Sequence, residues 1–205
     1  PAPSRFRSRL RNPAWPMLNI GAGGAALVLR KGHRQNLVLE SSFRGDGSFS
    51  RDCIVPFMGS AAWPPKSGHL GAYRFEVTNP GEFKKKLGER TLPNFFTVVR
   101  ESLADSGLTQ QDIDYLALLH FKRSAHEAIL TELGLDENQT TYLENYGHIG
   151  QNDQILSVEL GLQAGRIKPG NIIVLVGAGL GFVWAATGIR WGGTSARSKT
   201  PDLVS

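Results

Sequence analysis

The stretch Gly165–Trp191, which reads GRIKPGNIIVLVGAGLGFVWAATGIRW, decides the fold of this 205-residue chain. Pro169-Gly170 is typical of a turn. Four of the five residues in Ile172–Val176 are β-branched, which predicts a buried strand. The glycine-rich loop Gly177–Gly181 then separates this strand from a return strand over Val183–Arg190. The stretch therefore predicts two neighbouring strands of one sheet.

Upstream of this stretch, segments with helical spacing of apolar residues alternate with short apolar runs. Helices are predicted over residues 81–88, 92–106, 124–133 and 153–164. Strands are predicted over residues 18–30 (as a buried turn and strand), 35–43, 73–77, 115–119 and 140–143. The alternation from residue 95 onward indicates an α/β fold with a largely parallel sheet covered by helices.

Composition excludes several classes of protein. Hydrophobic residues make up 40% of the chain, enough for a sizeable core, and a single cysteine excludes an internal disulfide framework and gives no metal-binding pattern. No apolar stretch of about 20 residues predicts a membrane span, and no signal peptide is evident. We therefore expect a cytoplasmic protein without a metal.

The net charge of +5 is concentrated at the start of the chain, where residues 1–12 carry four arginines and no acid. Such an arm can bind nucleic acid, but no nucleic-acid-binding signature accompanies it, so we favour a solvated segment or one that packs on a partner. A basic patch would also suit an acidic carrier protein. We divide the chain into a basic Pro/Arg-rich segment (1–16), a folded domain (17–191) and a flexible tail (192–205).

Two histidines and one aspartate are the candidate catalytic residues. His120 directly follows a predicted buried strand and precedes a helix, where the helix N-terminus favours a neutral imidazole that can donate to an oxyanion or accept a proton. A hydrogen-bonded core histidine is the alternative. His148 lies in a turn between two glycines, and Asp153 lies near the start of the next helix. Asp153 is predicted to be a helix N-cap, a residue that orients a histidine, or both.

Other residues are candidates for substrate contact. Lys122 and Arg123 follow His120 and can meet a phosphate-bearing arm or an acidic partner, or they are ordinary charges in a first helical turn. The loop with Gly177, Gly179 and Gly181 opens a strand rather than a helix, so we interpret it as a source of backbone N–H groups for an oxyanion rather than as a nucleotide loop. Cys53 has no small-residue elbow around it, and we interpret it as an ordinary cysteine rather than a nucleophile.

The order of these motifs over residues 17–191 resembles ketoacyl-ACP synthase III enzymes of the thiolase superfamily. The run 21–26 looks like the family's GDGAGA-type turn, 120–123 stands in the place of its HQAN motif, and 147–150 stands in the place of its GNTS motif. Residues 165–171, 177–184 and 189–191 are similar to the GRIKPGD and GxGxGFTWGAxxIRW ending, which is the most specific part.

The resemblance implies a thiolase-like αβαβα layered fold, of which this chain looks like the C-terminal half with a mainly mixed or parallel five-stranded sheet. It implies an acyltransferase whose cysteine lies in the N-terminal half, on the same enzyme or a companion chain. It implies a CoA or phosphopantetheine thioester as substrate, no tightly bound cofactor, acyl carrier protein or acyl-CoA as partner, and a homodimer of complete units. His120, His148 and Asp153 would be catalytic.

Departures from the family pattern leave the reaction open. His148 replaces the asparagine of GNTS, and Arg123 replaces the asparagine of HQAN. Relatives that transfer acyl groups to a hydroxyl use a Cys-His-Asp set, in which Asp153 is a candidate for the acid. Three alternatives follow: acyl transfer to an acceptor, decarboxylative Claisen condensation with malonyl-ACP, and a non-catalytic subunit that completes a partner's fold.

Overall fold

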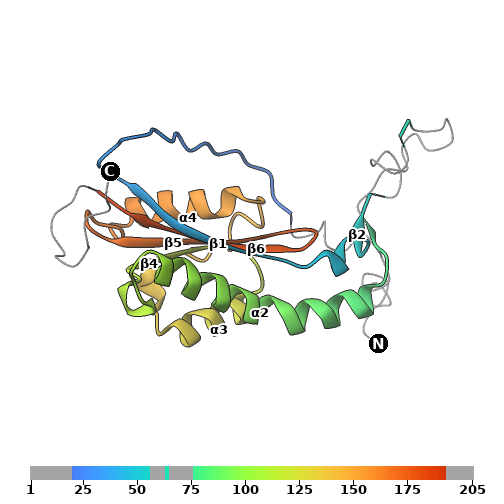
Figure 1. Cartoon of the computed structure of the whole chain (residues 1–205). Coiled ribbons are helices and arrows are strands. Elements are labelled where there is room, and N and C mark those ends of the chain that lie inside the picture. The colour runs from blue at the N-terminus through green and yellow to red at the C-terminus, as the bar shows by residue number, and fades with distance from the viewer. Residues whose placement is uncertain (1–19, 56–62, 65–75, 193–205) are drawn as a thin grey trace, which may run out of the picture.

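A mixed four-stranded sheet with helices on both faces forms the body of the protein (Figure 1). The computed structural model describes residues 20–55, 63–64 and 76–192. The strand order is β1-β6-β5-β4, and the bounds are β1 Leu37–Gly45, β4 Tyr115–Leu118, β5 Ile172–Gly179 and β6 Val183–Arg190. The pair β4–β5 is parallel, whereas β5–β6 and β6–β1 are antiparallel. The predicted α/β class is confirmed.

Within the described residues the main sheet has four strands rather than the predicted five. The mixed pairing that the resemblance implied is confirmed, whereas the largely parallel pairing predicted from the alternation of segments is wrong. Residues 140–143 do not form a strand, because Thr140 meets Leu116 of β4 through one isolated bridge. Residues 21–30 form no strand either, and Val28 is 94% exposed where a buried strand was predicted. A strand needs a second strand for its backbone groups, and within the described residues no strand pairs with this segment. Its backbone contacts are a bridge between Ile20 and His148 and a bond from the Asn152 side chain to the Gly23 carbonyl.

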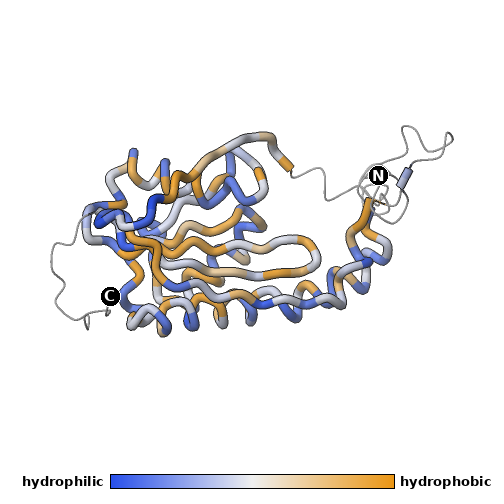
Figure 2. The backbone as a smooth tube through the Cα atoms, turned by 45° about the horizontal axis from the view of Figure 1, so that its top comes forward, coloured by the Kyte–Doolittle hydropathy of each residue, from blue (hydrophilic) through white to orange (hydrophobic). Residues whose placement is uncertain are grey.

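One long helix, α2 (Pro80–Asp105), replaces the two helices that the sequence predicted. Asn79 caps its start, and Pro93 lies inside it. A proline inside a helix removes one hydrogen bond. Pro93 is exposed, so the carbonyl that loses this partner can be solvated, while Phe83 and Phe95 on either side are buried against the core. Figure 2 shows the alternation of hydrophobic and hydrophilic residues along this helix.

The sheet carries α2 and α3 (Arg123–Leu133) on one face and α4 (Asn152–Gln163) on the other (Figure 1). The main core lies between α2, α3 and the sheet and includes Trp184, Val174 and Val98. A smaller cluster under α4 includes Tyr115 and Ile173. The helices near the site begin and end within one residue of the predicted bounds, and Gly134 ends α3 with a left-handed φ of 68°.

The remaining elements are short. Strands β2 (Cys53–Ile54) and β3 (Glu76–Val77) form a separate two-stranded sheet near the start of α2, and three 3₁₀ turns span Gly47–Phe49, Gln110–Asp112 and Glu137–Gln139. The predicted basic segment 1–16, and all of the predicted tail 192–205 except Gly192, lie outside the described residues. Among the residues that the structure describes, no helix is both long and apolar enough to cross a membrane.

Candidate active site

The candidate site lies where the parallel strands β4 and β5 end. His120 follows β4 by two residues, and the preceding Leu119 donates its N–H to the Val176 carbonyl of β5 at 3.0 Å. The N-terminus of α4 meets the same edge, since the Gln154 side chain donates to that carbonyl at 2.8 Å. The carboxyl ends of parallel strands are where α/β proteins present functional groups. The topology therefore brings residues 120 and 148–154 together.

Asp153 joins the two histidines. Its side chain is completely buried, and its Oδ2 accepts from the His120 backbone N–H at 2.7 Å and from the His148 Nδ1 at 2.6 Å. Its Oδ1 accepts from the Ile149 N–H at 2.8 Å. Asp153 is the second residue of α4, and Gln151 holds the N-cap position, so the predicted N-cap role was wrong. The carboxylate binds loop groups outside its own helix, and it therefore fixes the place of both histidines.

His148 is the more accessible of the two imidazoles, with 31% of its side chain exposed. In the neutral form of the His148 ring, Nδ1 carries the proton that the carboxylate accepts, and Nε2 keeps a lone pair. Gly147 and Gly150 flank it, both with a φ of 69°. Gly21 also holds this loop, because its N–H donates to the His148 carbonyl at 2.9 Å. A Cβ at Gly21 would lie 2.4 Å from the backbone carbonyl oxygen of Tyr146. Only glycine fits there.

His120 is buried, with 8% of its surface exposed. Burial is the main cause that lowers its pKa below 6.5, with Asp153 opposing and His148 adding to the shift. Its ring lies 4.9 Å from the Tyr142 ring, and within the described part of the chain its buried Nδ1 has no hydrogen-bond partner. The His120 imidazole is therefore neutral at physiological pH, and it can donate one N–H to the oxygen of a substrate.

Most of the predicted glycine loop Gly177–Gly181 belongs to strand β5. Gly177 and Gly179 belong to β5 and pair with Ala185 and Val183 of β6, and only Leu180–Phe182 turn between the strands. Backbone groups of successive strand residues point to opposite sides. Since Val176 faces β4, Gly177 and Gly179 face β6, and Ala178 faces the open side beyond the end of β4.

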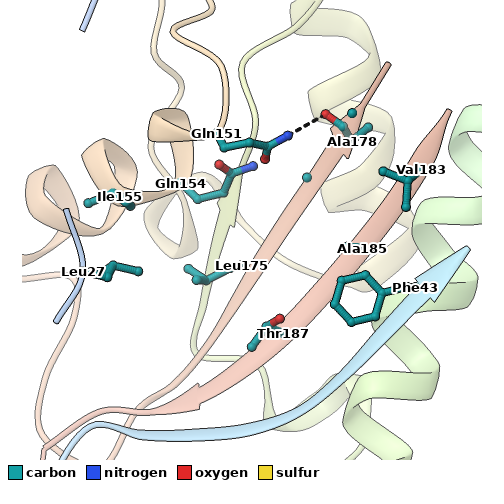
Figure 3. Close-up of a pocket in the computed structure, with 12 residues that line it drawn as sticks. Leu27, Phe43, Gln151, Gln154, Ile155, Leu175, Ala178, Val183, Ala185 and Thr187 are labelled. Carbon is teal, nitrogen blue, oxygen red and sulfur yellow. Dashed lines mark hydrogen bonds between the residues drawn. The ribbon is translucent and has the colours of Figure 1, made fainter. Parts of the chain in front are cut away.

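A cavity of about 330 Å³ borders this strand (Figure 3). Gln151 and Gln154 reach it from α4, and the Gln151 side chain donates to the Ala178 carbonyl at 2.9 Å. A Cβ at Gly177 would lie 2.7 Å from the Gln154 Nε2 and 2.8 Å from the Gln151 Oε1. Gly177 thus allows the start of α4 to approach β5. Gly181 lies in the turn with a φ of 142°, a value that favours glycine.

Comparison with known proteins identifies the family. Residues 103–191 match the family model described as 3-oxoacyl-[acyl-carrier-protein (ACP)] synthase III C terminal. Beta-ketoacyl-[acyl-carrier-protein] synthase III of Rhizorhabdus wittichii is 33% identical over 172 residues, which cover 83% of this chain and 50% of that protein. The protein of the same name from Thermosynechococcus vestitus is 27% identical over 177 residues, covering 84% and 52%. The chain is a ketoacyl-ACP synthase III-like protein of the thiolase superfamily.

Solved structures agree in fold. The 3-oxoacyl-(acyl carrier protein) synthase III of Pseudomonas aeruginosa PAO1 superposes with a TM-score of 0.63 at 19% identity, over 80% of this chain and 47% of that one. The enzyme of Aquifex aeolicus VF5 gives a TM-score of 0.62 at 14% identity, over 79% and 46%. The chain spans about half the length of the curated relatives it matches and corresponds to the C-terminal half of a ketoacyl-ACP synthase III-like protein.

Two predicted contact residues of this synthase-like chain differ in their surroundings. Arg123 binds Glu144 at 2.6 Å, and its guanidinium lies 4.2 Å from the centre of the Tyr142 ring. Lys122 is exposed at the start of α3 and makes no side-chain cap there. The arginine is held by the protein itself, whereas the lysine points to solvent. Their role in substrate contact stays a prediction.

Sequence reasoning missed Tyr142. Its ring contacts the His120 ring and, at 5.2 Å, the buried His126 ring, and its hydroxyl donates to the Phe121 carbonyl at 3.1 Å. Its position in the sequence gives no signal, because the contact forms only when the segment that follows the 3₁₀ turn Glu137–Gln139 lies beside β4. Cys53 lies in β2, and burial, with Asp52 adding, raises the pKa of its thiol to about 11, which agrees with an unreactive cysteine.

Proposed function

We propose that the chain is the C-terminal half of an acyltransferase of ketoacyl-ACP synthase III type, which moves an acyl group from a CoA or acyl-carrier-protein thioester through a cysteine to an acceptor. The observation that carries this proposal is the carboxylate of Asp153, which holds the His148 ring and the His120 backbone at once. The cysteine belongs to the N-terminal half, in the same polypeptide or a companion chain. The complete units form a homodimer, and no cofactor is tightly bound.

In the first half-reaction, the cysteine thiolate attacks the carbonyl carbon of the donor thioester. The carbonyl becomes an oxyanion, and its collapse breaks the bond to the sulfur of CoA or phosphopantetheine, which leaves as a thiolate and takes up a proton. The neutral imidazole of His120 and the backbone N–H of Ala178 are the candidate donors to this oxyanion. Both lie at the edge where β4 and β5 end.

In the second half-reaction, a hydroxyl or amine of the acceptor attacks the acyl-cysteine. The His148 Nε2 takes the acceptor's proton as the new bond forms, and the imidazolium returns that proton to the cysteine sulfur when the thioester bond breaks. Asp153 stabilises the imidazolium through the 2.6 Å bond to Nδ1. Asp153 is therefore a positioning residue, and His148 is the proton carrier.

The paired imidazole favours acyl transfer over condensation. Decarboxylation of a malonyl thioester creates its own carbanion, so it needs hydrogen-bond donors for an enolate oxygen but no base. The His148–Asp153 pair supplies a base, which a hydroxyl or amine acceptor requires. Claisen condensation would release CO₂ from a malonyl thioester, and acyl transfer would not.

The test uses the complete enzyme, acyl-CoA and a panel of small alcohols and amines, with the acyl adduct followed by intact mass. His148→Ala is expected to form the adduct but to lower turnover by about 10²–10⁴-fold, the range of a lost general base. Asp153→Asn should lower it similarly, while Asp136→Asn, at an exposed cap, should not. Wild-type turnover by both His120→Ala and His148→Ala would leave only the alternative of a non-catalytic subunit. Release of CO₂ from a malonyl thioester would favour condensation.

A further inference from the structure

Tyr142 contacts the segment of His120 at two points. The centre of its ring lies 4.9 Å from the centre of the His120 imidazole, and its hydroxyl donates to the Phe121 carbonyl at 3.1 Å. Phe121 directly follows His120 in the chain. One side chain therefore touches both the ring of this histidine and the backbone that comes after it.

The start of α3 in turn holds Tyr142. The buried His126 ring meets the tyrosine ring edge-on, with centres 5.2 Å apart and planes at 75°, and the Arg123 guanidinium lies 4.2 Å from its centre. Arg123 is itself bound to Glu144 at 2.6 Å. Burial lowers the pKa of His126 to about 4, so this ring is uncharged at physiological pH. Edge-on ring contacts and a cation over a ring are favourable arrangements, and together they hold the Tyr142 ring in place.

The His120 ring depends on packing for its orientation. Asp153 binds its backbone N–H, but its Nδ1 is buried and has no hydrogen-bond partner among the described residues. The His148 ring differs, because its Nδ1 is bonded to the same carboxylate. The last torsion of a histidine side chain has a broad energy minimum, so an imidazole without a bond at Nδ1 turns unless its neighbours prevent it. The Tyr142 ring lies against the imidazole and provides this restraint.

The same packing keeps the imidazole of His120 neutral. A protonated ring would carry an N–H on Nδ1, and a buried N–H without an acceptor is costly. This cost also favours Nε2 as the site of the single proton on the neutral ring. Burial is the main cause that lowers the pKa of His120, with Asp153 opposing and His148 adding to the shift. A neutral ring in a fixed orientation can therefore present one N–H to a substrate oxygen.

We propose that Tyr142 is a positioning residue for acyl transfer, whose ring and hydroxyl hold the His120 imidazole in the orientation from which it donates to the oxyanion. This role rests on the proposed function, in which His120 is one of two candidate donors to that oxyanion. Tyr142 acts only through His120 and contacts no reacting atom. Loss of its ring would let the imidazole turn and would let water reach it. The rate of the chemical step would then fall while binding of the acyl donor stays the same.

The experiment compares Tyr142→Leu with Tyr142→Phe in the complete enzyme. Leucine removes the ring, whereas phenylalanine keeps the ring and removes only the hydroxyl that binds Phe121. Leu133→Ala is the control for lost stability, because Leu133 is buried in the last turn of α3, whereas Arg123 and His126 lie in its first turn. Circular dichroism shows whether each variant is folded. If the leucine variant does not fold, Tyr142→Met takes its place, since methionine fills the space without a ring.

The first measurement is the rate at which the enzyme gains an acyl group from acyl-CoA in a single turnover, followed by intact mass at several acyl-CoA concentrations. Tyr142→Leu should lower the maximal rate by about 10²-fold, the effect of a misplaced catalytic group, with the same half-saturating concentration. Tyr142→Phe should lower it by less than about tenfold, the effect of one lost hydrogen bond. A folded leucine variant that is no slower than Leu133→Ala would overturn the proposal.

The second measurement does not depend on turnover. Nuclear magnetic resonance of the enzyme with isotope-labelled histidine follows the His120 ring, whose signal is the one that His120→Ala lacks. In Tyr142→Leu the pKa of His120 should rise toward 6.5, because water reaches the ring while Asp153 and His148 stay in place. Tyr142→Phe and Leu133→Ala should leave this pKa unchanged.

The two measurements separate the positioning role from the proposed function. An unchanged pKa of His120 in Tyr142→Leu would overturn the positioning role. If the enzyme without substitutions gains no acyl group, the proposed function is refuted instead. The signal of the His120 ring would then still decide whether Tyr142 holds it.

Discussion

Replacing Asp153 with asparagine tests whether this carboxylate holds the site together. Asp153 accepts three hydrogen bonds of 2.6–2.8 Å from the two histidines and Ile149. Asparagine has one acceptor oxygen, so its amide must face either the Ile149 N–H or the two groups on Oδ2. One backbone N–H then loses its acceptor, which costs about 1–3 kcal/mol. The hydrogen bonds that remain are weaker, because their acceptor is no longer charged. The free energy of unfolding should fall by about 2–5 kcal/mol.

Equilibrium urea unfolding followed by circular dichroism measures this loss. Asp136→Asn is the matched control, because Asp136 also accepts a backbone N–H, from Asn138 at 2.7 Å, but is exposed at a cap where asparagine serves equally. The control should stay within about 0.5 kcal/mol of the unchanged protein. An Asp153→Asn protein as stable as the control would refute the three-bond reasoning.

Three further changes test the contribution of one buried histidine and the space around two helical glycines. Burial, with smaller contributions from Arg123 and His120, lowers the pKa of His126 from 6.5 to about 4. Between these two pH values the unfolded chain binds a proton at this residue and the folded chain does not. The contribution of His126 to the free energy of unfolding is therefore complete above pH 6.5 and is lost as the pH falls toward 4. The loss should reach about 3 kcal/mol and should be absent in His126→Gln, as pH-dependent urea titrations would show. Gly161→Ala should cost about 1–3 kcal/mol, because its Cβ would lie 2.7 Å from the buried Tyr115 ring. Gly88→Ala in α2 should instead raise the free energy of unfolding by about 0.5–1 kcal/mol, since nothing lies within 4 Å of a Cβ at this position. Thermal unfolding of both glycine variants measures these changes. A Gly161→Ala protein as stable as the unchanged protein would contradict the close packing of α4.

Local signals predicted the elements around the site well. The β-branched run at 172–176, the apolar run at 115–118 and the glycine at 134 each act through neighbours along the chain, so the sequence alone carries them. The same logic failed for residues 21–30 and 140–143. Both are apolar enough for strands, but a strand exists only if another backbone lies beside it, which local composition does not encode.

Pro93 shows the opposite failure. Two helices were predicted over residues 81–88 and 92–106, yet burial of Phe83 and Phe95 on the two sides of Pro93 keeps α2 continuous. Tertiary packing outweighed a local preference of about 3 kcal/mol.

The sequence by itself determined the α/β class, the two histidines and the aspartate as candidates, and the resemblance to one family. Only the tertiary structure decided how these residues are paired. It placed the Asp153 carboxylate on the His148 ring and on the backbone of His120, 33 residues away in the chain. It also placed Tyr142 against His120 and left a cavity beside α4. These contacts join segments distant in sequence, and their geometry is fixed by how β4, β5 and α4 pack.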